Sequence, residues 1–148
     1  MSFIIFSQFN NCLQHIKKAL INNNITVDII NGTKTRIQRK EAIEKFKQKK
    51  VQVFLLSTKT ASIGLTLTTS YHMFFVEPIL DAQIFKQAVG RIFRIGQKNN
   101  VTIETLYSKN SIENKQKIDN FKKNILNKKN SQIKKMKMIY LHSMLVMD

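Results

Sequence analysis

The stretch VQVFLLSTKTASIGLTLT, residues 51–68, decides the fold class of this chain. Residues 51–56 form an apolar run, which predicts a strand covered on both faces of a parallel sheet. The loop that follows carries six serine and threonine hydroxyls, one lysine and one glycine. Because ligands of doubly wound sheets bind beyond the carboxyl ends of the strands, this loop is a candidate phosphate-binding segment. An ordinary Ser/Thr-rich connection explains the segment equally well.

Apolar runs and helical stretches alternate on both sides of this segment. Further strands are predicted at residues 3–6, 25–30, 71–76 and 101–107. A first helix is predicted to begin after Ser7, its N-cap, with an inward face formed by Leu13, Ile16 and Leu20. A second helix is predicted at 35–47, and its inward face is formed by Ile37, Ala42, Ile43 and Phe46. A third helix is predicted at 82–93. This alternation indicates an α/β fold, a doubly wound parallel sheet with helices on both faces.

The composition is strongly basic, with 25 lysines and arginines against 9 acidic residues and a net charge of +16. Such a charge favours a polyanionic partner, because side chains that neutralise phosphates release counterions. However, 21 of the basic residues are lysine, and asparagine and isoleucine are also abundant, which AT-rich coding would produce unaided. The charge alone is therefore weak evidence for nucleic acid.

Several classes of protein and site are excluded at this level. Cys12 is the single cysteine, so an internal disulfide is impossible, and no Cys/His cluster has zinc-ligand spacing. His15, His72 and His142 lack a partner carboxylate at motif spacing, so each is expected to be a structural or surface histidine rather than a catalytic one. No apolar run approaches the ~18 residues of a membrane span, and a signal peptide is lacking. We expect no metal site, no membrane partner, and a cytosolic or nuclear location.

The composition shifts near residue 109. Residues 109–137 contain ten lysines and two acids, with apolar residues at loosely helical spacing. Residues 136–147 are too apolar for a solvated tail and are expected to dock on the domain or on a neighbour, rather than on a membrane surface. The sequence therefore predicts a domain at 1–108 and a basic C-terminal helical extension at 109–148.

Two further segments contain the four arginines of the chain. In QAVGRIFRIGQ, residues 87–97, Arg91 and Arg94 lie three apart on one face of the predicted helix. Arginine binds phosphate through a planar fork, so the pair indicates an anion site, with two ordinary surface arginines as the alternative. Gly90 is expected to allow another backbone to approach, and Gly96 to end the helix. In NGTK, residues 31–34, a turn opens the helix of Arg36 and Arg39, whose N-terminus could hold a nucleic-acid phosphate.

Several nucleotide-binding patterns are missing from the chain. It has no Gly-x-x-x-x-Gly-Lys-Ser/Thr loop, no Asp-Glu pair to hold Mg²⁺ and no Gly-x-Gly-x-x-Gly fingerprint. The chain is therefore not expected to bind and hydrolyse a nucleoside triphosphate alone by the usual route.

Residues 4–114 resemble the C-terminal helicase lobe of Swi/Snf family DNA-dependent ATPases, within the superfamily-two helicases. IIFSQF at 4–9 is similar to motif IV, and residues 31–46 are similar to the segment after it. LLSTK at 55–59 through GLTL at 64–67 resembles motif V, and residues 87–97 resemble motif VI with its family-specific ending RIGQ. EPIL at 77–80 is closest to the branch that bears histone-linker, PHD and RING modules.

The resemblance implies a RecA-like lobe that closes over ATP held by an N-terminal lobe, which supplies the phosphate loop and the Mg²⁺-binding acids. Arg91 and Arg94 would be arginine fingers supported by Gln87. Nucleotide binding and coupling would involve Gly64, Leu65, Thr66 and Gly90. Double-stranded DNA would be held by Ser7, Gln8, Gly32, Thr33, Ser57, Thr58 and Lys59. The expected role is that of a motor lobe in a nuclear DNA-translocating protein of chromatin or DNA repair, with nucleosomes as a further partner.

Two departures from the family pattern bear on this expectation. The family usually has two glycines where this chain has Ala61 and Ser62, and an asparagine where it has Thr66, which predicts weaker coupling. The N-terminal lobe is missing, so the chain is expected to be inactive by itself. A fragment of a longer protein is the favoured explanation, and an N-terminal lobe on another chain or a loss of activity are the alternatives. A non-catalytic basic nucleic-acid-binding module is the alternative, and an RNA helicase lobe is disfavoured by the RIGQ ending.

Overall fold

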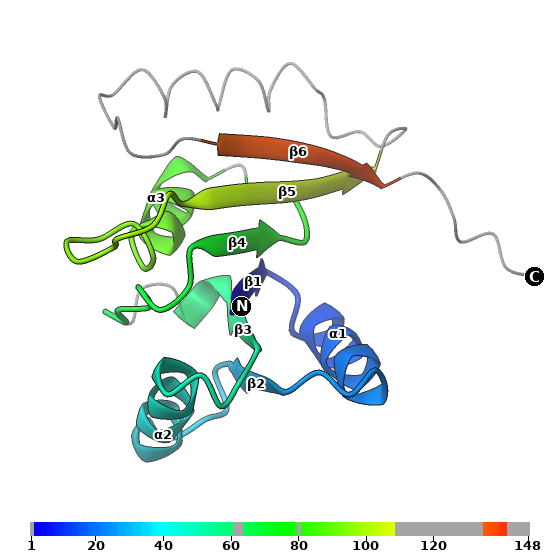
Figure 1. Ribbon diagram of the computed structural model, residues 1–148. Coiled ribbons are helices and arrows are strands. Elements are labelled where there is room, and N and C mark those ends of the chain that lie inside the picture. Colours follow the sequence, from blue (N-terminus) through cyan, green and yellow to red (C-terminus); the bar gives the residue numbers. More distant parts are fainter. Residues whose placement is uncertain (1, 61–63, 80, 109–134, 142–148) are drawn as a thin grey trace, which may run out of the picture.

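The computed structural model describes residues 2–60, 64–79, 81–108 and 135–141, which form one sheet with helices on both faces (Figure 1). All six strands are parallel, in the order β2-β3-β1-β4-β5-β6. The strands are β1 (Phe3–Ser7), β2 (Val27–Ile30), β3 (Val53–Ser57), β4 (His72–Phe75), β5 (Thr102–Ser108) and β6 (Lys135–Leu141). The helices are α1 (Asn10–Asn22), α2 (Arg36–Lys47) and α3 (Ala82–Val89), and a short 3₁₀ turn, η1 (Thr58–Thr60), follows β3. The predicted α/β class is confirmed.

Strand β3 is buried at every position, as its apolar run predicts. Its side chains alternate between two cores, because successive residues of a strand point to opposite faces. Phe54 and Leu56 join the larger core, whereas Val53 and Leu55 join the smaller one.

The two cores show how the helices are divided between the faces of the sheet. Helix α1 contributes Leu13 to the smaller core, with Ile16 and Leu20 packed against it. Helices α2 and α3 contribute to the larger core, where Phe46 stacks on Phe54 with ring centroids 4.8 Å apart. The sheet is therefore doubly wound, with helices on both of its faces.

Two expectations about the helices are wrong. Ser7 is not the N-cap of the first helix, because it is the last residue of β1 and the helix begins at Asn10 with Phe9 in the cap position. Ile37 does not face the core, since its side chain is 72% exposed while Ala42 and Phe46 are buried. Helix α2 begins with a capping box between Thr35 and Gln38, which satisfies two backbone N–H groups of its first turn.

The helix predicted at 82–93 is also shorter than expected, because α3 ends at Val89 and Gly90 is its C-cap. Residues 90–97 continue as turns, so Arg91 and Arg94 do not share a helical face. Gly96 does not end a helix but lies in these turns with a φ of +98°, a conformation that favours glycine. A Cβ at position 90 would lie 3.1 Å from the Lys86 carbonyl oxygen, so the close backbone is the last turn of α3 itself.

The helical extension is wrong for residues 135–141, which form strand β6 along β5. Residues 109–134 and 142–148 lie outside the described residues, as do Ala61, Ser62 and Leu80. The boundary between 108 and 109 stays a prediction, although β6 adds a strand to the sheet of the predicted first domain. Within the described ranges, none of the helices combines the length and the apolar character that a membrane span requires.

Candidate functional site

The carboxyl ends of three neighbouring strands bring the predicted binding segments to one edge of the sheet. Ser7 at the end of β1 pairs in register with Ser57 at the end of β3. Strand β2, which neighbours β3, ends just before Asn31 and Gly32. Parallel strands place these ends together, so residues that are far apart in sequence share one surface.

The hydroxyl groups at this edge differ in how they are held. Ser57 is buried, and its Oγ has no hydrogen-bond partner among the described residues. Thr58 is half-buried in η1, which also contains Lys59. Thr33 donates from its N–H and its Oγ1 to Asn31 Oδ1, at 3.3 and 2.7 Å, so the turn around Gly32 is braced by a buried asparagine.

Glu77 organises the end of β1, and sequence reasoning assigned it no role. Ser7 Oγ donates a hydrogen bond to Glu77 Oε2 at 3.0 Å, and the Gln8 backbone N–H donates to Glu77 Oε1. Ser7 Oγ also accepts from the Phe9 N–H. Ser7 is fully buried by these contacts, whereas Gln8 is exposed. The glutamate therefore fixes the backbone that presents Gln8, and an acid directly after a buried strand is the signal that would have found it.

The loop after β3 meets the turns after α3 through two hydrogen bonds. Arg94 Nη1 donates to Thr66 Oγ1 at 2.8 Å. The Leu67 backbone N–H donates to the Arg91 carbonyl oxygen at 2.9 Å. Leu67 is fully buried, so it anchors this junction in the larger core. The junction brings predicted site residues Thr66, Arg91 and Arg94 together.

The surroundings of Arg91 disfavour its positively charged form. Burial, and then repulsion from the Arg94 guanidinium, lower the pKa of Arg91 below its ordinary value. Its Nε is buried, with no hydrogen-bond partner in the part of the chain that the structure describes. A bound anion would both satisfy this donor and relieve the repulsion between the two guanidinium groups.

Gln97 gives a physical reason for the last residue of the RIGQ ending. Its side-chain Nε2 lies 2.8 Å from the Ser70 carbonyl oxygen, 3.2 Å from that of Thr68 and 3.3 Å from that of Ile92. Its Oε1 accepts from the Asn99 N–H at 3.0 Å. The side chain thus ties residues 92–99 to residues 68–70 and fixes the turns that carry Arg94.

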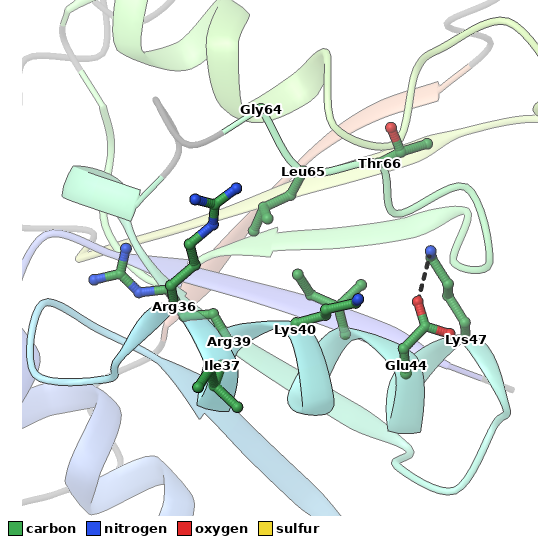
Figure 2. A pocket seen from close by; sticks show the side chains of 10 residues that line it. Arg36, Ile37, Arg39, Lys40, Glu44, Lys47, Gly64, Leu65 and Thr66 are labelled. Carbon is green, nitrogen blue, oxygen red and sulfur yellow. Dashed lines mark hydrogen bonds and ion pairs between the residues drawn. The ribbon is translucent and has the colours of Figure 1, made fainter.

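Other predicted site residues lie on either side of this junction. Gln87 is exposed on α3, three residues before Gly90 at the helix end. Gly64 is exposed and Leu65 half-buried in the loop after β3. Together with Thr66 they form one wall of a cavity of about 730 Å³, whose opposite wall is helix α2 (Figure 2).

The comparison with protein families decides the assignment. Residues 1–96 match the family described as "Helicase conserved C-terminal domain". The chain belongs to this family. It is the C-terminal lobe of a superfamily-two helicase, and its relatives are of the Swi/Snf type.

Individual relatives of this helicase lobe are much longer than the chain. It is 36% identical over 114 residues to the DNA excision repair protein ERCC-6-like of Bos taurus, covering 76% of the chain and 9% of that protein. It is 35% identical over 112 residues to the DNA repair protein RAD5 of Yarrowia lipolytica, covering 76% of the chain and 11% of that protein. The chain thus spans about a tenth of these relatives' length.

A solved structure agrees in fold with this helicase lobe. The crystal structure of the C-terminal part of the Fun30 ATPase domain matches with a TM-score of 0.74 and 29% sequence identity. The match covers 81% of the chain and 38% of that structure. The RecA-like fold of the helicase lobe is therefore shown, and the assignment to the histone-linker, PHD and RING branch stays a prediction.

Within the described part of the helicase lobe, no three His, Cys, Asp or Glu side chains lie close enough together to hold a metal ion.

Proposed function

We propose that this helicase lobe completes the ATP site of a DNA-translocating ATPase whose N-terminal lobe holds the nucleotide. The hydrogen bond from Arg94 to Thr66 carries the proposal, because it joins the two segments that would face ATP. Arg91 lies at the same junction through its carbonyl oxygen. A phosphoryl group entering here would meet two guanidinium groups on turns fixed by Gln97.

The charges at the junction favour that assignment. The two guanidinium groups repel each other, and the buried Nε of Arg91 has no hydrogen-bond partner among the described residues, so the site is incomplete without an anion. In phosphoryl transfer, an arginine that neutralises the developing charge accelerates the reaction about 10³- to 10⁵-fold. Arg91 and Arg94 would act in this way on the γ-phosphate, with the exposed Gln87 supporting them. ATP and Mg²⁺ would be held mainly by the N-terminal lobe, which supplies the electrostatic activation of the phosphates.

We propose that the strand-end edge grips one strand of duplex DNA by its phosphates. Gln8, Gly32 and Thr33 are exposed there, and a Cβ at position 32 would meet no atom within 4 Å, so a phosphate has room to approach. Ser57, Thr58 and Lys59 extend the same edge, and Ser57 Oγ, which has no hydrogen-bond partner in the described part of the chain, is a further hydroxyl donor. Ser7 would act indirectly, because its hydroxyl is bound to Glu77.

The coupling between grip and hydrolysis would run through the loop after β3. Ser57 and Thr58 begin this loop at the proposed DNA edge, and Gly64, Leu65 and Thr66 end it at Arg94. Gly90 would contribute by having no side chain, because a Cβ at this position would lie 3.1 Å from the Lys86 carbonyl oxygen, where the turns after α3 begin. Relatives named for DNA repair support a role of the whole protein in DNA repair. We further propose that it acts in the nucleus, on chromatin or in repair, with nucleosomes as a further partner.

A chimera tests the proposal directly. The full chain replaces the corresponding C-terminal lobe of the RAD5 relative from Yarrowia lipolytica, and DNA-stimulated ATP hydrolysis is measured. We expect hydrolysis that Arg91→Ala and Arg94→Ala each abolish, while Lys98→Ala, on an exposed neighbouring position, leaves it unchanged. Hydrolysis that survives both arginine substitutions would overturn the assignment.

A non-catalytic nucleic-acid-binding module is the second candidate, and the net charge of +16 favours it. In that case all affinity for DNA would lie in the Lys-rich residues 109–148. Salt-titrated DNA binding with and without these residues separates the candidates, because the number of phosphate contacts sets the salt slope. A chimera that folds and binds DNA but hydrolyses no ATP, with binding lost on this truncation, supports the module.

A further inference from the structure

A groove on the α2 side of the lobe combines apolar and cationic surface. Its volume is about 730 Å³, within the usual range for ligand pockets of roughly 300–1,000 Å³. Helix α2 forms one wall and residues 64–66 form the other, and Figure 2 shows Leu65 pointing toward the helix. The lining residues are Arg36, Ile37, Arg39, Lys40, Ile43, Glu44, Lys47, Gly64, Leu65 and Thr66.

The charges along the groove are unevenly distributed. Lys47 forms an ion pair with Glu44 at 3.0 Å, so these two charges offset each other at one end. Arg36 and Arg39 lie toward the other end, and Lys40 lies between them and this pair (Figure 2). Arg36, Arg39 and Lys40 therefore leave an excess of three positive charges on the groove. An occupant must carry negative charge to match it.

The apolar residues of the groove point to more than a simple anion. Ile37 is 72% exposed although it lies on the helix beside two arginines. Ile43 and Leu65 are packed against the larger core and add apolar surface to the walls. A phosphate chain would neutralise the arginines but would leave Ile37 in water, whereas burying such a side chain is favourable.

The buried part of Arg39 adds an independent observation. Its Nε is shielded from solvent and has no hydrogen-bond partner within residues 2–60, 64–79 and 81–108. A buried donor without a partner is costly, and a carboxylate is the acceptor that a guanidinium binds best in a fork geometry. Among the described residues, Arg39 Nε thus has no acceptor, and the one acid of the groove, Glu44, is paired with Lys47.

We propose that this groove binds an amphipathic peptide segment of a partner, one that carries carboxylates beside apolar side chains. The apolar side chains pack against Ile37, Ile43 and Leu65. The carboxylates bind Arg36, Arg39 and Lys40. This is the helix-in-groove mode of recognition, with arginines providing the charge selectivity. The groove shares Gly64, Leu65 and Thr66 with the loop that is proposed to couple DNA binding to ATP hydrolysis, and peptide binding is measured in the absence of both DNA and ATP.

Fluorescence anisotropy with the full chain tests this proposal. The probe is a labelled helical peptide with leucines on one face and glutamates beside them, and a scrambled peptide of the same composition is its control. Because a net charge of +16 attracts any acidic peptide, the comparison between the two peptides separates groove binding from general attraction. We expect the amphipathic peptide to bind at least about tenfold more tightly, the scale set by burying one isoleucine-sized side chain.

Two matched substitutions locate the binding site. Ile37→Asp places an acid in the groove, whereas Ile21→Asp changes an equally apolar side chain, 52% exposed, on α1 at the other face of the sheet. Both lower the net charge equally and both are at exposed positions. We expect Ile37→Asp to weaken peptide binding at least about tenfold and Ile21→Asp by less than about twofold.

Two kinds of result would overturn the proposal. Equal effects of the two substitutions, or equal binding of the scrambled peptide, would show attraction by charge alone. Displacement of the peptide by duplex DNA, together with DNA binding that Arg36→Ala weakens and Ile37→Ser does not, would assign the groove to nucleic acid. Circular dichroism and thermal melting of each variant confirm that the compared proteins are folded.

Discussion

The two arginine pairs of this lobe have the same spacing in the sequence but lie in different kinds of backbone structure. Arg36 and Arg39 lie in the regular helix α2, whereas Arg91 and Arg94 lie in turns beyond α3. On α2 the spacing places both residues on one face, along an open groove. Beyond α3 the spacing has no such meaning, because each residue is placed by a different contact.

Hydrogen bonds therefore determine whether two arginines three residues apart share one face. The Arg91 carbonyl oxygen accepts from Leu67, which lies in another segment, and the Arg94 side chain donates to Thr66. A tertiary network therefore fixes the second pair, while the helix positions the first pair. Residues 64–66 lie near both arginine pairs. They line the groove beside Arg36 and Arg39, and they include Thr66, whose hydroxyl accepts the hydrogen bond from Arg94.

The largest expected effect comes from removing the second pair. In the chimera, Arg94→Ala should lower ATP turnover about 10³- to 10⁵-fold, equivalent to about 4–7 kcal/mol of transition-state stabilisation. The substitution should leave the fold intact, because Arg94 is exposed. Steady-state ATP hydrolysis measures it. A loss of less than about tenfold would remove Arg94 from the proposed catalytic role.

Removing the support of that pair should have a smaller effect. Gln97→Ala would deprive three carbonyl groups, of Thr68, Ser70 and Ile92, of their side-chain donor. We expect a loss of about 1–3 kcal/mol in the free energy of unfolding, measured by urea denaturation of the full chain. Gln83→Ala on the exposed start of α3 is the control. Equal stability of the two variants would contradict the anchoring role of Gln97.

The link between the arginine pairs can be weakened without removing an arginine. Thr66→Val removes the oxygen that accepts from Arg94 Nη1 and keeps the shape of the side chain. We expect turnover of the chimera to fall by up to about tenfold, because one charge-assisted hydrogen bond at an exposed position is lost. Thr66→Ser retains the oxygen and should stay near the starting rate. If valine and serine behave alike, the bond does not position Arg94.

The smallest effect is expected where the helix itself holds the first pair. Thr35→Ala removes the side chain that accepts from the Gln38 N–H in the capping box of α2. We expect a loss of about 1 kcal/mol in unfolding free energy, with Thr35→Ser close to the starting protein. Chemical denaturation measures both. If Thr35→Ala lowered the unfolding free energy as much as Gln97→Ala does, the helix cap would be as important for Arg36 and Arg39 as Gln97 is for Arg91 and Arg94.

Much of the fold could be predicted from sequence because the parallel sheet is covered on both faces. The strand at residues 53–57 and helix α2 lie close to their predicted positions. The error at residues 135–141 is instructive, because KMKMIYL was interpreted with a helical period although lysine and methionine alternate over its first four residues. Alternation with a period of two is the strand signal. Strand β5 would otherwise present an open row of backbone groups, and β6 pairs with it along seven residues.

The candidate site was predictable in its members and less so in its contacts. Thr66, Arg91 and Arg94 were expected from motif order, and they meet at one junction. Glu77 was assigned no role, because its two partners lie about 70 residues earlier in the chain. Contacts at such separation follow from strand order, which no local pattern specifies.

The alternating apolar runs are visible in the sequence and specify the parallel α/β sheet, because burial on both faces leaves a local signature. The sequence also determined which segments hold the four arginines and the four glycines. The end of α3 at Val89 and the contacts beyond it have no such local signature. There the Arg91 carbonyl oxygen accepts from the Leu67 N–H, and Arg94 donates to Thr66, so both bonds join segments that are far apart in the chain. Such contacts depend on how the chain packs in three dimensions.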